Sequence, residues 1–318
     1  MKVLITGGAG HLGITISRYF LKQGIPVRVF DLDNARNRKS VEGLKHAVEI
    51  CWGDITDEAS IRNALEGIDT VVHMAAILPP VADRMPSLAG KVNIDGTRLL
   101  VNEIKSTGRA IPLIYTSSVA VHGPTPDAAE PICADQHVCN PKGAYAQTKY
   151  EAENIIKGSG LDYVILRLSV NMYFNFEISD IKRMFSIPLK NRIEFCHPEN
   201  TAVAIVNAAA KFEQVKNQTF IISGGPNDRM HYRDLIGAIL NVMGLPVPPE
   251  YKFTSKPYYL DWYETGKSET MLTYHIKTFA HYMQDYTREL SRRFTPAFLP
   301  FMRYFVGPVF GWMVVRFM

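Results

Sequence analysis

The sequence predicts an α/β fold: a doubly wound, Rossmann-type parallel sheet with a smaller C-terminal substrate lobe. The first observation is the stretch 2–13, where a short apolar run breaks into a glycine-rich turn and continues as an amphipathic segment. That order is typical of a strand, a tight turn and the start of a helix. The second observation is that the alternation of apolar runs and amphipathic segments continues along the chain. This favours parallel strands joined by right-handed helical crossovers.

The glycine turn has the composition that a bound pyrophosphate requires. It fits G-x-G-x-x-G when read from Gly8 and G-x-x-G-x-x-G when read from Gly7. Glycine permits backbone angles that a Cβ forbids and lets a phosphate approach the main chain closely. The helix that follows directs its free N–H groups and the positive end of its dipole at the same place. The residues expected to hold the pyrophosphate are Gly7, Gly10, His11, Leu12 and Gly13.

An acidic residue follows at the spacing of a dinucleotide site. The apolar run 27–30 ends in Asp31, 18 positions after the last glycine of the turn, close to the ~20-residue offset of the carboxylate that binds an adenosine ribose. A carboxylate there repels a 2′-phosphate, so the expected cofactor is NAD. Arg36, Arg38 and Lys39 follow closely, and NADP stays open if their loop folds back onto the ribose.

The remaining elements are placed from the same alternation. Strands are expected at 48–52, 70–73, 112–116, 161–168 and 220–223, and helices near Asp57 and Leu88 and over 145–156 and 201–212. Residues 171–197 and 226–300 show no clean period. The expected domains are a dinucleotide-binding core over 1–170, with returns near 198–224, and a substrate lobe with a C-terminal segment over 171–197 and 225–318.

Residues just beyond two of the expected strands lie where ligands bind in a doubly wound sheet. Asp54 and Ile55 follow the third strand, and Asp54 is expected either to contact the adenine or to cap the next helix. Met74, Ala75 and Ala76 follow the fourth strand. These side chains are small enough to let a cofactor lie across the strand tips.

Ser118, Tyr145 and Lys149 form the expected catalytic group. Tyr145 and Lys149 are four positions apart, so on a helix their side chains project from one face. A phenol of pKa ~10 is a weak base at neutral pH, but a close opposite charge shifts a pKa by roughly 1–3 units. The lysine ammonium and a positive nicotinamide are therefore expected to favour the phenolate for acid–base work. Ser118, at a strand tip, is expected to hold the substrate oxygen beside the phenol.

These motifs occur in a fixed order over roughly the first 225 residues. They are T-G-G-A-G-H-L-G at 6–13, Asp31, G-D at 53–54, H-M-A-A at 73–76, Asn93 before G-T at 96–97, T-S-S at 116–118 and Y-A-Q-T-K at 145–149. In this order they resemble the extended short-chain dehydrogenase/reductase family, the NAD-dependent epimerase/dehydratase group. The resemblance implies that Asn93 lies near the nicotinamide ribose and that Lys149 also binds the ribose hydroxyls. V-H-G at 121–123 stands where the family has V-Y-G, which selects Ser118 over Ser117 as the catalytic hydroxyl.

Some departures from the family pattern bear on the substrate. Sugar dehydratases of the family carry an Asp-Glu pair after the catalytic hydroxyl, whereas this chain has Val119 and Ala120, so dehydration is disfavoured. After Arg167 the family often shows P-x-x-V-Y-G-P, whereas this chain reads L-S-V-N-M-Y at 168–173. The apolar loop 77–81 is similar to hydroxysteroid dehydrogenases and dihydroflavonol reductases. A substrate less polar than a sugar nucleotide therefore stays open.

Composition limits the partners and the compartment. The chain has 318 residues, of which 47% are hydrophobic and 21% charged, and a formal net charge of +4, which is ordinary for a globular protein. Five arginines and one glutamate within 288–318 supply a local +4, so no nucleic-acid partner is expected for the main body. The four cysteines form no C-x-x-C pair. We expect no signal peptide, no metal site and a reducing, cytoplasmic compartment.

The C-terminal stretch 294–318 is rich in aromatic residues and methionine. Its uncharged run, 304–315, has 12 residues and contains Pro308, whereas a membrane-spanning helix needs ~20 residues. We expect this stretch to be buried against protein. A peripheral membrane contact and an oligomer contact stay open, and a homodimer is the expected assembly.

The motifs lead to three functional hypotheses. The first is an NAD(P)-dependent oxidoreductase-type enzyme acting on a secondary alcohol or ketone, and specifically a nucleotide-sugar epimerase. The second is a net dehydrogenase or reductase of an apolar alcohol or ketone. The third is a non-catalytic regulator that senses a dinucleotide, against which the presence of Ser118, Tyr145 and Lys149 argues.

Overall fold

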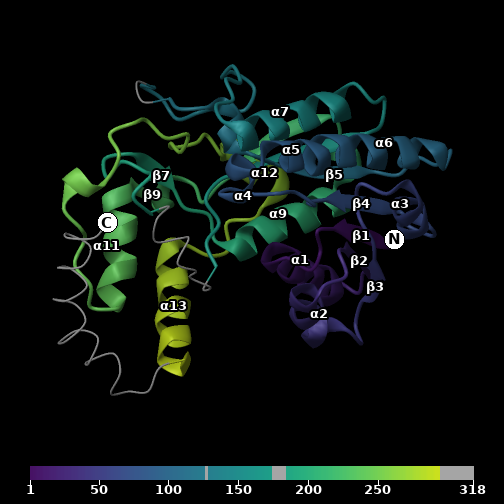
Figure 1. The fold of residues 1–318 in the computed structure, drawn as a ribbon, viewed down its shortest axis with the longest axis horizontal. Helices are drawn as coiled ribbons and strands as arrows, with labels where there is room; N and C mark the ends of the chain where they lie inside the picture. Colours follow the sequence, from purple (N-terminus) through teal and green to yellow (C-terminus); the bar gives the residue numbers. More distant parts are fainter. Residues whose placement is uncertain (126–127, 174–183, 294–318) are drawn as a thin grey trace.

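The structure, a computed structural model, describes residues 1–125, 128–173 and 184–293. The main-sheet strands are β1 (Val3–Thr6), β2 (Val27–Asp31), β3 (Glu49–Trp52), β4 (Thr70–His73), β5 (Leu113–Ser118), β6 (Tyr163–Leu168) and β8 (Gln218–Ile222). They form one seven-stranded parallel sheet in the order β3-β2-β1-β4-β5-β6-β8 (Figure 1). The order reverses between β1 and β4, at the switch point where such sheets bind ligands. The predicted Rossmann-type fold is confirmed.

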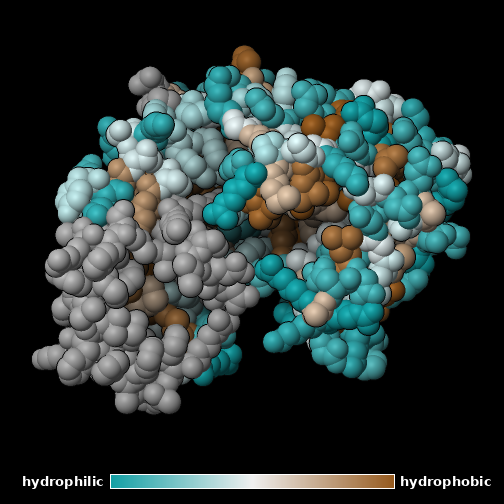
Figure 2. Space-filling model, in the orientation of Figure 1, coloured by the Kyte–Doolittle hydropathy of each residue, from teal (hydrophilic) through white to brown (hydrophobic). Residues whose placement is uncertain are grey.

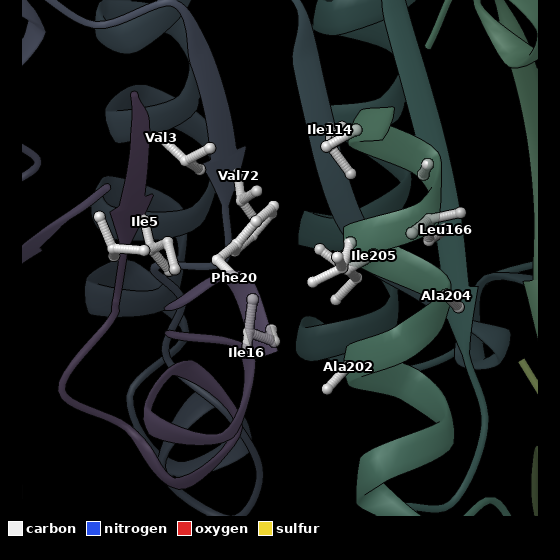
Figure 3. Close-up of a cluster of buried hydrophobic side chains, with 14 of the residues drawn as sticks. Val3, Ile5, Ile16, Phe20, Val72, Ile114, Leu166, Ala202, Ala204 and Ile205 are labelled. Carbon is white, nitrogen blue, oxygen red and sulfur yellow. The ribbon is translucent and has the colours of Figure 1, made fainter. Parts of the chain in front are cut away.

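Helices cover both faces of this sheet, and we call the sheet with these helices the core. One face carries α1 (His11–Lys22), α2 (Ala35–Val41) and α9 (Pro198–Ala210), and the other carries α3 (Glu58–Leu65), α6 (Gly96–Ser106) and α7 (Ala144–Lys157) (Figure 1). Figure 3 shows the first of these faces, where Ile16 and Phe20 of α1 and Ile205 of α9 lie against the strands. Burying each such side chain stabilises the fold by about 1.5–3 kcal/mol.

The helix expected near Leu88 is a longer and less regular run. It consists of α4 (Val81–Arg84), α5 (Pro86–Ala89) and a π-helical turn (Gly90–Asp95) that leads directly into α6. A π turn adds a residue to the helix and is frequent at functional sites. Asn93 lies in this turn and is 1% exposed.

Beyond β6, the described residues outside α9, α10 (Phe212–Val215), α12 (Gly266–Leu272) and β8 build a smaller unit, which we call the lobe. In it β7 (Arg192–Glu194) pairs antiparallel with β9 (Arg229–His231), and α11 (Tyr232–Val242) packs against α13 (Phe279–Arg293). Glu194 is fully buried and accepts hydrogen bonds from Arg229 Nε at 2.8 Å and from the N–H groups of Gly225 at 2.9 Å and Tyr263 at 3.0 Å.

The remaining elements are short. They are α10 (Phe212–Val215), α12 (Gly266–Leu272), which packs on α9 and β8, and the 3₁₀ turns Glu42–Leu44, Val119–His122, Pro226–Asp228 and Glu250–Lys252. Within the described part of the chain, no helix combines the length and apolarity needed to cross a membrane. The stretch 294–318, for which burial against protein was expected and a membrane or oligomer contact left open, lies outside the described residues.

Candidate active site

The glycine turn joins β1 to α1 through very close backbone contacts. Gly7 has φ +69°, and a Cβ there would lie 2.9 Å from Ala75 Cα. A Cβ on Gly13 would lie 2.5 Å from the Gly8 carbonyl oxygen, so both residues must be glycine for α1 to approach the turn. Gly10 occupies the N-cap position of α1. The first N–H groups of the helix, from His11 onward, therefore lie at the switch point of the sheet.

Asp31 lies at the end of β2 and is tied to the same turn. Its Oδ2 accepts from Ala9 N–H at 3.0 Å, and its Oδ1 accepts from Leu32 N–H at 2.8 Å and from Asn37 Nδ2 at 3.0 Å. Burial raises the pKa of Asp31, and these hydrogen bonds oppose the rise. The carboxylate thus fixes the glycine turn through Ala9 N–H, and its contact with a ribose stays a prediction.

Asp54 and Ile55, which follow β3 after Gly53, have different environments. Asp54 is exposed, and its Oδ1 accepts from Thr56 N–H at 2.8 Å and Thr56 Oγ1 at 2.9 Å. The cap of α3 is Asp57, whose carboxylate accepts from Ser60 N–H at 2.9 Å, so Asp54 does not cap that helix. Ile55 is buried, and its Cγ2 lies 3.0 Å from where a Cβ on Gly96 would be. The contact of Asp54 with an adenine stays a prediction.

A buried polar chain, which the sequence did not indicate, joins the tips of β1 and β4. His73 Nδ1 lies 2.7 Å from Thr6 Oγ1, and His73 Nε2 lies 2.9 Å from Thr97 Oγ1. Thr97 donates its hydrogen to the Asn93 carbonyl at 2.7 Å, so it accepts from His73 Nε2–H. Thr6 in turn donates to Nδ1 and accepts from the N–H groups of the two residues after His73. Burial lowers the pKa of His73 to about 3, which keeps this ring neutral.

The Asn93 side chain connects three segments of the site. Its Oδ1 accepts from Ile77 N–H at 2.7 Å, and its Nδ2 donates to the Ile77 carbonyl at 3.1 Å and to Thr148 Oγ1 at 2.9 Å. Thr148 directly precedes Lys149 on α7. Asn93 therefore fixes the loop after β4 relative to the helix of the expected catalytic residues, and its place near a ribose stays a prediction.

Two of the three expected catalytic residues are buried around the tip of β5. Ser118 is the last residue of β5, is 8% exposed and accepts from Ala120 N–H at 3.2 Å, so its own hydrogen can be donated to a substrate oxygen. Lys149 Nζ donates to the Thr116 carbonyl at 2.7 Å and lies 4.6 Å from the centre of the Tyr115 ring. Burial lowers the pKa of Lys149 to about 7.

Tyr145, the third of these residues, lies one helical turn before Lys149 and is half-buried on α7, which packs against β5. Burial raises the pKa of Tyr115 on β5, and the Tyr145 phenol adds to this effect. The phenol of Tyr145 is therefore close to the strand that carries Ser118. The assignment of a catalytic role to the three residues stays a prediction.

One turn further along α7, Glu153 forms a buried ion pair. It is fully buried and binds Arg167 of β6 through Nε at 2.9 Å and Nη2 at 2.7 Å. Burial raises the pKa of Glu153, but the bonds and charge of Arg167 outweigh burial and the pKa is lowered. The same guanidinium lies 3.1 Å from His122 Nε2. This pair fixes α7 against β6 beneath Lys149, a role that a lone Glu and Arg in the sequence do not indicate.

The segment after β6 returns to the start of α1. The ring of Tyr173 stacks on His11, with 5.1 Å between ring centres and 23° between planes. This contact places the departure from the family pattern at 168–173 beside the glycine turn, which the sequence did not indicate.

Metal-binding residue types gather where α9 begins. His197, Glu199 and Asp285 offer ligand atoms within 4.8 Å of one another. Lys277 Nζ lies 2.5 Å from Glu199 Oε1 and 3.4 Å from Asp285 Oδ2, so a lysine ammonium already balances these carboxylates.

The model of the NAD dependent epimerase/dehydratase family matches residues 3–177, more than half of the chain. The chain therefore belongs to this family. It is 33% identical over 165 residues to a D-erythronate dehydrogenase of Cupriavidus necator, covering 49% of each chain. It is also 33% identical over 182 residues to a UDP-glucose 4-epimerase of Lactobacillus helveticus, covering 55% of this chain and 52% of that one.

A crystal structure of a Bacillus cereus UDP-glucuronic acid 4-epimerase, in complex with UDP-glucuronic acid and NAD, shares the fold. The TM-score is 0.77 at 20% identity, over 91% of this chain and all of that one. The chain spans about half the length of the curated relatives it matches.

Proposed function

We propose that this chain is an NAD-dependent enzyme that oxidises a secondary alcohol and, as an epimerase, returns the hydride to the opposite face of the ketone. The observation that supports it is the convergence of Ser118 and Lys149 on the tip of β5, with Tyr145 on the same helix as Lys149. Membership of the family supports the same reaction class.

The residues of the turn fit a dinucleotide. The backbone around Gly7 and Gly13 has no room for a Cβ, the N-terminus of α1 faces the switch point, and Asp31 lies at the end of β2. Asp31 supports NAD over NADP, and Arg38 is engaged in a bidentate pair with Asp33 at 2.5 and 2.6 Å. When bound, the nicotinamide accepts and returns the hydride.

The side chains divide the acid–base work. The Ser118 hydroxyl donates to the substrate oxygen and orients it, while the Tyr145 phenolate takes the proton of the alcohol. Lys149 favours the phenolate through its positive charge. Because burial lowers the pKa of Lys149 to about 7, this charge is lost as the pH rises above neutrality.

The test uses the purified full chain loaded with NAD. UDP-glucose is supplied while absorbance at 340 nm and the sugar product are followed, since an epimerase forms product without net NADH. Tyr145→Phe should lower turnover by about 10²–10⁴-fold while NAD stays bound, and Tyr150→Phe on the same helix should not. Unchanged turnover in Tyr145→Phe would contradict the proposal and favour a dinucleotide-sensing regulator.

A second candidate is a net dehydrogenase or reductase. The similarity to a D-erythronate dehydrogenase supports it. Net NADH formation on a secondary alcohol, with no sugar epimer formed, would select this form of the reaction.

A further inference from the structure

Arg167 on β6 connects the two segments that carry the expected catalytic residues. It is 3% exposed, and its strand partner in β5 is Ser117, which directly precedes Ser118. Its guanidinium binds Glu153 through Nε at 2.9 Å and Nη2 at 2.7 Å, and its Nη1 lies 3.1 Å from His122 Nε2. One buried side chain therefore reaches both the helix α7 and the turn that follows β5.

Glu153 lies on the segment that carries two of the three catalytic residues. It follows Lys149 by one turn of α7 and Tyr145 by two turns, so the three side chains project from one face of the helix. Two parallel bonds between a guanidinium and a carboxylate fix direction as well as distance. The pair of Glu153 with Arg167 therefore places this face of α7 relative to β6.

His122 lies on the segment that carries the third catalytic residue. It ends the buried 3₁₀ turn Val119–His122, whose N-cap is Ser118. A guanidinium has only donors, so His122 Nε2 accepts from Arg167 and the ring hydrogen is on Nδ1. Burial lowers the pKa of His122 to about 3, which keeps the ring neutral. Because Nδ1 has no hydrogen-bond partner among the described residues, the bond from Arg167 is what orients this ring.

The connection is sealed from solvent, unlike the side chains that it joins. Arg167, Glu153 and His122 are at most 3% exposed, whereas Ser118 is 8% exposed and Tyr145 is half-buried. Figure 2 shows a hollow in the molecule beside the hydrophobic surface of α4 and α5, two helices that pack on α7. The α7 helix also packs on the turn Val119–His122. Arg167 therefore acts through the segments that it holds and not by contact with a substrate.

We propose that Arg167 is a positioning residue, which binds Glu153 and His122 at once and thereby sets the separation between Ser118 and Tyr145. This inference rests on the proposed hydride transfer, in which both hydroxyls meet one substrate oxygen. A misplacement of about 1 Å at a reacting group costs about 10²-fold in rate. The buried bond to His122 therefore contributes to turnover in addition to stability.

The test is a double-mutant cycle in the full chain loaded with NAD. The substrate is UDP-glucose, or isopropanol if net NADH formation selects the dehydrogenase. His122→Phe keeps a planar ring but removes the acceptor, and it should lower kcat about 10–100-fold while KM and the NAD dissociation constant stay unchanged. In a Ser118→Ala background the same change should lower kcat by less than about twofold, because the hydroxyl that it misplaces is gone. His122→Gln, which returns an acceptor oxygen, should restore most of kcat.

His197→Phe is the matched control. His197 is 4% exposed, and its Nδ1 accepts from Glu199 N–H at 3.1 Å, so this variant also loses one buried acceptor. Because His197 is the N-cap of α9, the variant should lose stability in urea unfolding and retain kcat. If His122→Phe does not fold, Arg167→Lys takes its place in the cycle with the same expected result. A lysine keeps the charge for Glu153 but has one nitrogen where the guanidinium has three.

Two results would overturn the inference and leave the proposed hydride transfer standing. Equal losses of kcat with and without the Ser118 hydroxyl would show that the bond serves stability alone. Wild-type kcat in a folded His122→Phe would show that the bond does not affect the reacting groups. Absence of turnover of both substrates in the wild type would instead contradict the proposed function, and the inference would fall with it.

Discussion

Asn93 holds Ile77 through both of that residue's backbone groups, with Oδ1 accepting from its N–H at 2.7 Å and Nδ2 donating to its carbonyl at 3.1 Å. A neighbouring β-strand would normally form these two hydrogen bonds with its backbone. Here the side chain of Asn93, in a π turn, forms both. Because Nδ2 also reaches Thr148 Oγ1 at 2.9 Å, the loop after β4 and the helix α7 are fixed by the same amide.

Asn93→Ala should therefore destabilise the protein and lower its activity together. The change leaves the two backbone groups of Ile77 unpaired in a half-buried place, which costs about 1–3 kcal/mol for each unsatisfied group. Urea unfolding measures this loss. Asn102→Ala, at an exposed position of α6, is the control, and equal stability of the two variants would show that the Asn93 pairing contributes nothing.

The neutral His73 predicts a loss of stability in acid. Burial lowers its pKa from 6.5 to about 3 in the folded chain, so between these values the unfolded chain binds a proton that the folded chain does not. The contribution of His73 to the free energy of unfolding is thus complete above pH ~6.5. On acidification it falls by up to about 1.4 kcal/mol per pH unit.

His73→Asn should remove that part of the slope between pH 6.5 and 4, as measured by urea unfolding at several pH values. His122 and His197, whose pKa values burial lowers to about 3 and about 4, act in the same direction and stay in both proteins. Only the difference between wild type and variant therefore reports on His73. The exposed His46→Asn should leave the slope as it is, and an equal slope in His73→Asn would refute the neutral ring.

Asp31→Ala should weaken NAD binding about tenfold to a hundredfold, since a hydrogen bond to a charged group contributes about 1.5–3 kcal/mol. It should also destabilise the fold, because the N–H groups of Ala9 and Leu32 lose their acceptor. Isothermal titration gives the first effect and thermal unfolding the second. Asp33→Ala, which removes only an exposed pair with Arg38, should do neither, and an unaltered NAD dissociation constant in Asp31→Ala would exclude the ribose contact.

Gly13→Ala should abolish tight NAD binding and cost about 1–3 kcal/mol of stability through overpacking. A Cβ at Gly13 would lie 2.5 Å from the Gly8 carbonyl oxygen, which cannot move without opening the turn. Gly90 is the matched control, because it has helical angles and nothing within 4 Å of its Cβ position. Gly90→Ala should be neutral or slightly stabilising, and equal NAD affinity in both variants would contradict the close packing of the turn.

The core could be predicted because buried parallel strands read as near-continuous apolar runs. The strand at 70–73 has the bounds predicted for it, and the others differ by a few residues at their ends. The glycine turn and Asp31 were also readable, since their spacing is imposed by local geometry. The strands of the lobe were not predicted within 171–197 and 226–300, because β7 and β9 have three residues each and their pairing depends on the fully buried Glu194.

Residue type and spacing are enough to propose Ser118, Tyr145 and Lys149, and the structure brings Ser118 and Lys149 together at the tip of β5, while the catalytic role of the three stays a prediction. The site was not predictable where a role arises from distant partners. His73 forms hydrogen bonds with Thr6 and Thr97, which are 67 and 24 positions away. No local sequence pattern predicts these bonds. A histidine directly after the two valines of this strand was the one available signal. Likewise Asp54 stood at the right strand end, but the structure turns its carboxylate toward Thr56.

The position of β8 at the edge of the sheet affects how the chain folds during synthesis. This strand pairs with β6, yet its residues come after β7 and α9 in the sequence. During synthesis the amides and carbonyls on the outer edge of β6 therefore have no strand partner until residue 222 has left the ribosome. Open edges of this kind recruit other strands, so a fragment that stops near residue 170 should associate with itself rather than persist as a small nucleotide-binding unit.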